Sequence, residues 1–112
     1  MYHDPIERSA EVAFSDLPKE EGEEFVRNFS RHSSVSVTGE LTHAGYKDIP
    51  VSYLVCENDR CLPPKFQRSL IERIESVSGT KVDVTSIQAG HCPPVSAPQK
   101  VVDWILAMAA KV

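Results

Sequence analysis

Asp59 and His91 are the two side chains whose types and spacing point most directly to chemistry. Each follows an apolar stretch and lies in a short polar segment. An aspartate that accepts the Nδ1–H of a histidine fixes the ring tautomer, so that the other nitrogen can take a proton from a nucleophile. The pair would then form two members of a nucleophilic triad. A hydrogen-bonded histidine and a turn aspartate with structural roles only remain the alternative, because turns favour Asp for local reasons.

Two strands are predicted immediately before these side chains. Residues 49–56 form a nearly continuous apolar run without a polar face, as expected for a strand covered on both sides in a parallel sheet. Pro50 is tolerated there because it lies at the start of the run. In residues 81–87, valines alternate with polar residues, which predicts a half-exposed strand. The first strand leads to Asp59 and the second to the loop that carries His91.

A helix is predicted after each strand. Residues 63–77 place five large apolar side chains on one face, and Gly79 ends that helix. Ser96 and Gln99 fit a capping box for a last helix that runs to residue 112 and should dock its wide apolar face on the sheet. The order strand–helix–strand–helix demands a parallel strand pair. Both strands then end at one edge, where open α/β sheets bind ligands, so we expect the two candidate side chains to be neighbours.

The first 45 residues are expected to contribute one helix. Asp16 is a good N-cap for it, and Pro18 suits a first turn. The Ser-, Thr- and Gly-rich segment after it predicts a connection with a short extended piece at residues 35–37. A turn is predicted at residues 3–5, because the residue before a proline avoids the helical region.

Composition narrows the class of protein. The chain has 112 residues, enough for one small domain, with 41% hydrophobic and 25% charged residues, as in ordinary globular proteins. A net charge of −4 argues against a nucleic-acid partner. The longest apolar run is too short to span a bilayer, and no signal-peptide pattern opens the sequence. We therefore expect a soluble, cytoplasmic protein without a membrane partner.

The three cysteines suggest weaker alternatives. Their odd number argues against a disulfide framework. Cys56, Cys61, His91 and Cys92 make a poor zinc set, because the Cys-x4-Cys spacing is wide and Cys56 should point into the sheet, so no metal site is predicted. Cys61 and Cys92 are better explained as unrelated loop thiols than as a redox pair.

The residues that follow His91 suggest a substrate pocket. Cys92, Pro93 and Val95 are candidates for lining an apolar acyl or alcohol site. A plain turn into the next helix explains the same residues equally well.

From Tyr46 onward the sequence resembles the last part of an α/β-hydrolase. The matching features are the strand that ends in Asp59 with Leu-Pro after it, Gln67 on the next helix, Ala-Gly-His91, and Ser96-Ala-Pro98. The chain is most similar to the small esterase subgroup that includes plant methylesterases, salicylate-binding esterases and hydroxynitrile lyases, with similar fungal hydrolases. Asp16-Leu-Pro18 and Leu41-Thr42 also resemble the end of that subgroup's cap.

The resemblance implies a partial α/β-hydrolase fold. Residues 1–45 would be a remnant of the cap or lid with one helix, and residues 46–112 the C-terminal strand–helix–strand–helix unit of the core. Asp59 resembles the triad acid and His91 the general base. The substrate would be a small ester or acyl compound, and the reaction needs no metal or organic cofactor.

Two departures from the family pattern bear on function. The nucleophilic serine of this family lies on a Gly-x-Ser-x-Gly turn before the acid and the histidine. None of the five glycines frames a serine in this way, and the oxyanion-hole loop is also absent. Hydroxynitrile lyases of the subgroup carry a lysine directly after the histidine, where this chain has Cys92, which favours ester hydrolysis.

We therefore expect the chain to supply the triad acid and histidine of a carboxylic-ester hydrolase. The alternative is a truncated, non-catalytic fragment or pseudo-enzyme that needs the missing N-terminal half as its partner. Two parallel strands make a poor independent sheet with open edges, so association with that half or self-association is expected.

Overall fold

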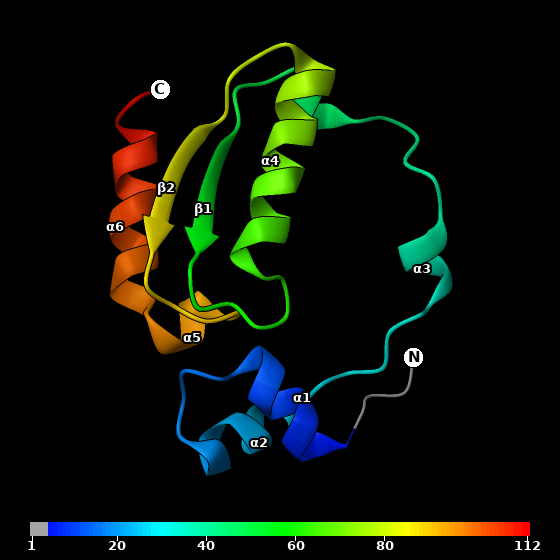
Figure 1. The fold of residues 1–112 in the computed structure, drawn as a ribbon, viewed down its shortest axis with the longest axis vertical. Coiled ribbons are helices and arrows are strands. Elements are labelled where there is room, and N and C mark those ends of the chain that lie inside the picture. The colour runs from blue at the N-terminus through cyan, green and yellow to red at the C-terminus, as the bar shows by residue number, and fades with distance from the viewer. Residues whose placement is uncertain (1–4) are drawn as a thin grey trace.

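The computed structural model describes residues 5–112 and places a two-stranded parallel sheet among helices (Figure 1). The elements of the core are β1 (Ser52–Cys56), α4 (Pro64–Ser78), β2 (Asp83–Ile87), the short helix α5 (Pro93–Ser96) and α6 (Pro98–Ala109). The register pairs Ser52 with Asp83 and Cys56 with Ile87. The partial α/β fold with a parallel strand pair, predicted from the sequence, is confirmed.

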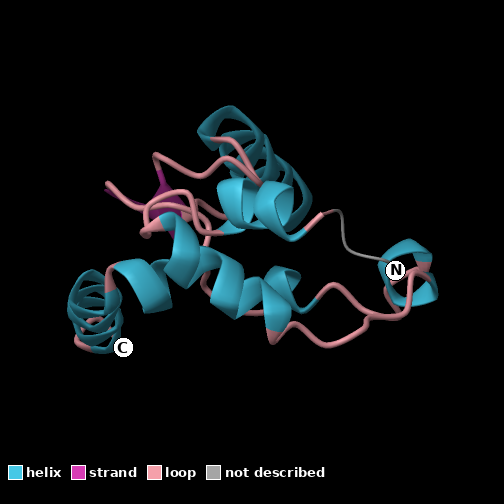
Figure 2. Cartoon of the chain, turned by 90° about the horizontal axis from the view of Figure 1, so that it is seen from below, coloured by secondary structure: helices cyan, strands magenta, loops and turns pink. Residues whose placement is uncertain are grey.

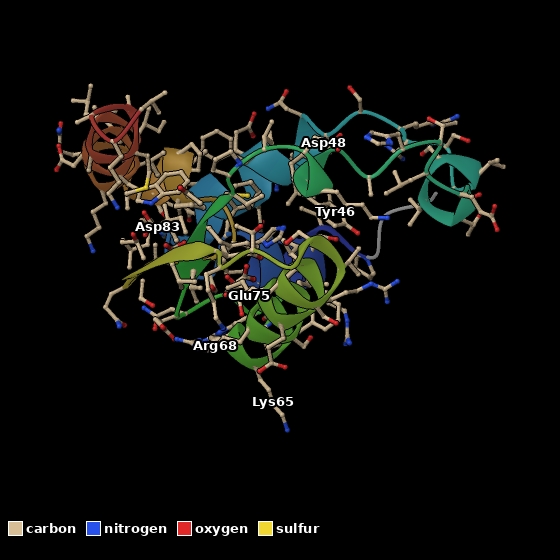
Figure 3. All side chains as sticks on the ribbon, turned by 90° about the horizontal axis from the view of Figure 1, so that it is seen from above. Tyr46, Asp48, Lys65, Arg68, Glu75 and Asp83 are labelled. Carbon is tan, nitrogen blue, oxygen red and sulfur yellow. The ribbon has the colours of Figure 1, made fainter. Side chains whose placement is uncertain are left out.

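Helix α4 is the crossover between the strands and packs against the sheet. Val55, Ile71 and Val82 form the buried core between helix and strands, and Val55 is fully buried. Burying one such side chain contributes about 1.5–3 kcal/mol, so this small cluster helps to attach α4 to the strands. Lys65 points away from the sheet (Figure 3), whereas Arg68 reaches the end of β1 and bonds to the carboxylate of Glu57. The helix ends at Gly79, whose φ of 72° is left-handed, as predicted.

Helix α6 covers the sheet less completely than predicted. The two strands lie between α4 and α6 (Figure 1), but none of the residues of α6 is buried. Ile105 and Leu106 are 52% and 63% exposed, whereas Trp104 and Met108 are half-buried. The expected docking of the whole apolar face is therefore wrong, because two strands are too narrow to cover it. No helix within residues 5–112 has the length and apolar character of a membrane span.

The N-terminal part contains more helix than predicted. Its elements are α1 (Ile6–Ala13), α2 (Lys19–Arg27), the short helix α3 (Val35–Thr38) and the 3₁₀ turn η1 (Gly45–Lys47). The expectation of one helix before residue 46 is wrong, and the extended piece predicted at residues 35–37 is part of α3. Helix α3 lies apart from the sheet in two perpendicular views (Figures 1 and 2). The turn predicted at residues 3–5 falls mostly on His3 and Asp4, which lie outside the described residues.

Helices α1 and α2 pack on each other and form what we call the α1–α2 hairpin. Ala10, Phe14 and Val26 are its buried core, and the rings of Phe14 and Phe25 stack with centroids 5.2 Å apart. The hairpin lies below the carboxyl ends of β1 and β2 (Figure 1). It therefore covers the edge of the sheet at which the candidate side chains were expected.

Both predicted helix caps are wrong. Helix α2 starts after Pro18 without a side-chain cap, and α6 starts after Ala97, also without one. The side chains of Asp16 and Ser96 instead bond to each other, although 80 positions separate them. Asp16 and Ser96 have the residue types of local helix caps, but each bonds to a residue far away in the sequence.

Candidate active site

The carboxyl ends of β1 and β2 bring Asp59 and His91 together across 32 positions of sequence. The pairing of the strands continues into their loops: the N–H of Glu57 donates to the carbonyl of Ile87 at 3.0 Å, and that of Asn58 to Ala89 at 3.1 Å. His91 Nδ1 lies 3.0 Å from Oδ2 and 3.2 Å from Oδ1 of Asp59. The predicted proximity of the two side chains is thus present in the structure.

The aspartate determines which ring nitrogen carries the proton. A carboxylate can only accept, so Nδ1 of His91 donates and Nε2 of the neutral ring is left as an acceptor. The side chain of Asp59 is 6% exposed and that of His91 is 29% exposed. Within residues 5–112, no serine hydroxyl is hydrogen-bonded to His91. The ring is thus held with Nε2 as its acceptor nitrogen.

Asp59 is also held by its own loop. Oδ1 accepts the backbone N–H groups of Cys61 and Leu62, each at 2.8 Å. Such contacts are typical of an aspartate that closes a turn on its own backbone. Hydrogen bonds to an ionised acceptor are about twice as strong as neutral ones. The carboxylate is therefore fixed by two amides on Oδ1, and the histidine lies nearer to Oδ2.

Gln67 of α4 braces this loop from the side opposite β2. Its side chain is buried, accepts the N–H of Cys56 at 3.0 Å and donates to the carbonyls of Cys56 at 3.0 Å and Leu62 at 2.7 Å. The neighbouring residue Glu57 bonds to β2, so the backbone of Cys56 faces the other way. The amide of Gln67 thus takes the place of a neighbouring strand at the last residue of β1.

Neither the bracing role of Gln67 nor the long-range contact of Asp16 was predicted. A glutamine on a helix carries no sequence signal of burial, and only the family resemblance distinguishes Gln67 from the other polar residues of α4. For Asp16, the local N-cap was the simpler explanation of the same residue type.

A surface cavity of about 270 Å³, wide open to solvent, lies beside the pair. Its lining consists of Ser52, Tyr53, Leu54, Cys56, Asp59, Leu62, Gln67, His91 and Pro93. Of the three predicted pocket residues, Pro93 lies there. Cys92 packs against the core of the α1–α2 hairpin, and Val95 is 37% exposed and not part of this lining. The substrate-pocket role of the three residues stays a prediction.

The cysteine thiols near the pair are not activated. Burial raises the pKa of Cys56, Cys61 and Cys92, and the nearby carboxylate of Asp59 raises each of them further. A raised pKa lowers the thiolate fraction at neutral pH, and the thiolate is the nucleophile. In the described part of the chain, no three His, Cys, Asp or Glu side chains are grouped so that they could hold a metal ion.

An acid and then a histidine, each on the loop after one of two parallel strands, have the order found in the C-terminal portion of an α/β-hydrolase. Residues 2–104 match the alpha/beta hydrolase family, and the chain belongs to this family.

Two fungal proteins are similar to the chain. Probable hydrolase R7 of Phoma sp. is 39% identical over 100 residues, which cover 89% of this chain and 41% of that protein. Alpha/beta hydrolase nvfD of Aspergillus novofumigatus is 36% identical over 64 residues, which cover 57% of this chain and 24% of that protein. The chain therefore spans about two fifths of the first and a quarter of the second. These similarities confirm the α/β-hydrolase resemblance and support a hydrolase-type function.

Proposed function

We propose that the chain supplies the acid, Asp59, and the general base, His91, of a serine hydrolase that acts on a small carboxylic ester. The observation that carries the proposal is the 3.0 Å contact between His91 Nδ1 and Asp59 Oδ2 beside a cavity of about 270 Å³. Family membership supports hydrolysis as the reaction type. The serine of the family pattern precedes both residues, so a further part of the fold must provide it.

In the proposed reaction the serine hydroxyl attacks the ester carbonyl and its proton passes to Nε2 of His91. Asp59 stays ionised and stabilises the imidazolium that forms. His91 then gives the proton to the leaving alcohol, and an acyl-serine remains. Water attacks this acyl group, again with His91 as base, and the carboxylic acid leaves as serine regains its proton. In each step the hydrogen bond from Nδ1 to Asp59 holds the imidazole ring in the same orientation.

Cys92 favours ester hydrolysis over the lyase reaction of the same subgroup. Its side chain packs against the core of the α1–α2 hairpin and is not part of the cavity lining. A half-buried neutral thiol does not provide the positive charge of the lysine that lyases carry at this position.

The structure also has surfaces suited to a partner, which we propose to be the rest of a hydrolase fold. Gln67 bonds the backbone of Cys56, but by alternation the backbone of Leu54 also faces away from β2, which leaves an open edge on the middle of β1. Ile105 and Leu106 leave an apolar face on α6. Open strand edges and apolar faces of this kind are usually covered. About three fifths of R7, the 59% left by a 41% match, lies outside the similar part.

These uncovered surfaces favour a chain that has no hydrolase activity by itself. It would become active when the rest of the fold is covalently joined to it or bound by it. Self-association through the same surfaces is the alternative. The oligomeric state in dilute solution distinguishes a self-associating chain from one that waits for a different partner.

A hybrid enzyme tests the proposal. The segment of R7 that matches this chain is replaced by the chain itself, and turnover of short p-nitrophenyl esters is measured beside unaltered R7 and the isolated chain. We expect turnover by the hybrid, none above background by the isolated chain, and a loss of about 10³-fold or more in kcat for Asp59→Asn in the hybrid. A folded hybrid without turnover, or an Asp59→Asn variant of full activity, would refute the assignment, provided that R7 itself hydrolyses the ester.

A further inference from the structure

Asp16 connects the α1–α2 hairpin to the loop that carries His91. Its Oδ2 accepts the backbone N–H of Gly90 at 2.6 Å and the hydroxyl of Ser96 at 2.5 Å. These partners lie before and after His91 in the sequence. One carboxylate oxygen thus holds both ends of the segment that contains the histidine.

The contact at Gly90 is closely fitted. A Cβ atom on this residue would lie 2.6 Å from Oδ1 and 2.8 Å from Cγ of Asp16, which is closer than real contacts allow. Gly90 and the preceding Ala89 are buried. Glycine is therefore the residue that lets the carboxylate approach the backbone next to the histidine.

The residue on the other side of His91 is held by the same hairpin. Cys92 packs against the cluster of Ala10, Phe14 and Val26. The histidine is consequently fixed from three directions: by a hydrogen bond on its preceding residue, by apolar packing on its following residue, and by Asp59 on its ring. Two of these three supports come from the α1–α2 hairpin.

Asp16 is ionised under ordinary conditions. Burial disfavours its charged form, but the hydrogen bonds from Ser96 and Gly90 outweigh burial, so the pKa of Asp16 is lowered. A carboxyl group with a lowered pKa in the folded state adds stability above its ordinary value, and this is lost as the pH falls through the lowered value. At neutral pH both contacts are therefore charge-assisted hydrogen bonds, which are the stronger kind.

We propose that Asp16 is a positioning residue for His91, which sets the backbone on both sides of the histidine so that Nδ1 points at Asp59. Asp16 is not part of the cavity lining and has no hydrogen bond to the imidazole ring. It acts through its hydrogen bonds to Gly90 and Ser96. The inference rests on the proposed function in taking His91 as the base. A residue that only attached the hairpin to the core would leave the orientation of the ring unchanged.

The test is an NMR comparison of variants of the full chain. The two ring ¹⁵N shifts of His91 report which nitrogen carries the proton, and amide exchange of Gly90 reports the contact with Asp16. In Asp16→Ala we expect Gly90 exchange to accelerate about tenfold or more and the ring to populate both neutral tautomers. In Asp16→Asn both the exchange rate of Gly90 and the tautomer ratio of His91 should lie between those of the unaltered chain and of Asp16→Ala, because the amide oxygen can still accept the two hydrogen bonds. Glu21→Gln, which removes one charge from α2, is the matched control and should change neither.

The outcomes separate three cases. Faster exchange at Gly90 with unchanged ring shifts would overturn the inference and leave Asp16 as an attachment only. If Asp16→Ala fails to fold, as judged by loss of amide dispersion, Ser96→Ala decides: a partial shift of the tautomer ratio supports the inference, and an unchanged ratio overturns it. If Nδ1 of His91 carried no proton in the unaltered chain, this would instead contradict the hydrogen bond from His91 to Asp59 and with it the proposed function.

Discussion

Within residues 5–112 the structure shows two histidine–aspartate pairs, which differ in exposure, in sequence separation and in the ring nitrogen that meets the carboxylate. His43 and Asp48 lie five positions apart in the segment before β1 and meet through Nε2 and Oδ2. Their side chains are 66% and 60% exposed. His91 and Asp59 lie 32 positions apart, meet through Nδ1, and are 29% and 6% exposed. A pair of suitable residue types is therefore not enough to identify a catalytic unit.

The difference lies in what supports each pair. The exposed pair is surrounded by water, and such pairs contribute about 0–1 kcal/mol because solvent screens them and both side chains lose freedom. The buried pair is held by the hydrogen bonds that pair the two strands, by two backbone amides that donate to Asp59, and by the side chain of Gln67, which bonds to the same loop. Of the two pairs, only the second is held by several elements of the fold and lines the cavity.

The largest stability effect that sharpens this contrast is expected from Gln67→Ala. The change leaves the N–H of Cys56 and the part-buried carbonyl of Leu62 without this partner, and the carbonyl of Cys56 with only the N–H of Asp59 at 3.3 Å. A buried group left unsatisfied costs about 1–3 kcal/mol. We expect the free energy of unfolding to fall by about 3 kcal/mol, measured by urea denaturation with Trp104 fluorescence. Gln99→Ala, which removes an exposed contact to Asp103, is the control and should stay within about 0.5 kcal/mol. Equal effects of the two changes would show that the brace is not needed.

A smaller effect is expected on the reactivity of Cys61. Burial is the larger cause of its raised pKa, and the charge of Asp59 is the second. Because a raised pKa leaves less thiolate, alkylation of Cys61 should be slower than that of a free thiol at neutral pH and should rise as the pH increases. Asp59→Asn removes the second cause only, so alkylation should become severalfold faster and still lag behind a free thiol.

Peptide-resolved mass spectrometry after a timed pulse of iodoacetamide measures this rate for each cysteine. Asp48→Asn removes the same charge from the exposed pair and should leave Cys61 unchanged. An identical response to both substitutions would mean that Cys61 does not sense the buried carboxylate.

The sequence predicted the features that follow from topology. Parallel strands that end at Asp59 and His91 must bring these residues to one edge, and the structure shows them in contact. Helix α4 was predicted because its apolar side chains repeat with a helical period and Gly79 ends it. These signals depend only on neighbours in the chain.

The features that the sequence did not predict depend on distant partners. Asp16 and Ser96 have the residue types of helix caps, but they pair with each other and with Gly90 across the molecule. Of the residues of α1, only Ala10 is buried. Its buried cluster is completed by Phe14, which follows the helix, and by Val26 of α2. The exposure of α6 follows from the width of the sheet, which the composition of that helix does not reveal.

The comparison of the two histidines in the R7 hybrid tests the central claim most directly. The kcat for ester hydrolysis is measured for His91→Ala and, as the matched change, for His43→Ala. If His91 is the base and His43 only a surface residue, kcat falls by about 10³-fold or more in the first variant and stays within about twofold in the second. Equal rates in the two variants would contradict the assignment of the buried pair as the catalytic unit.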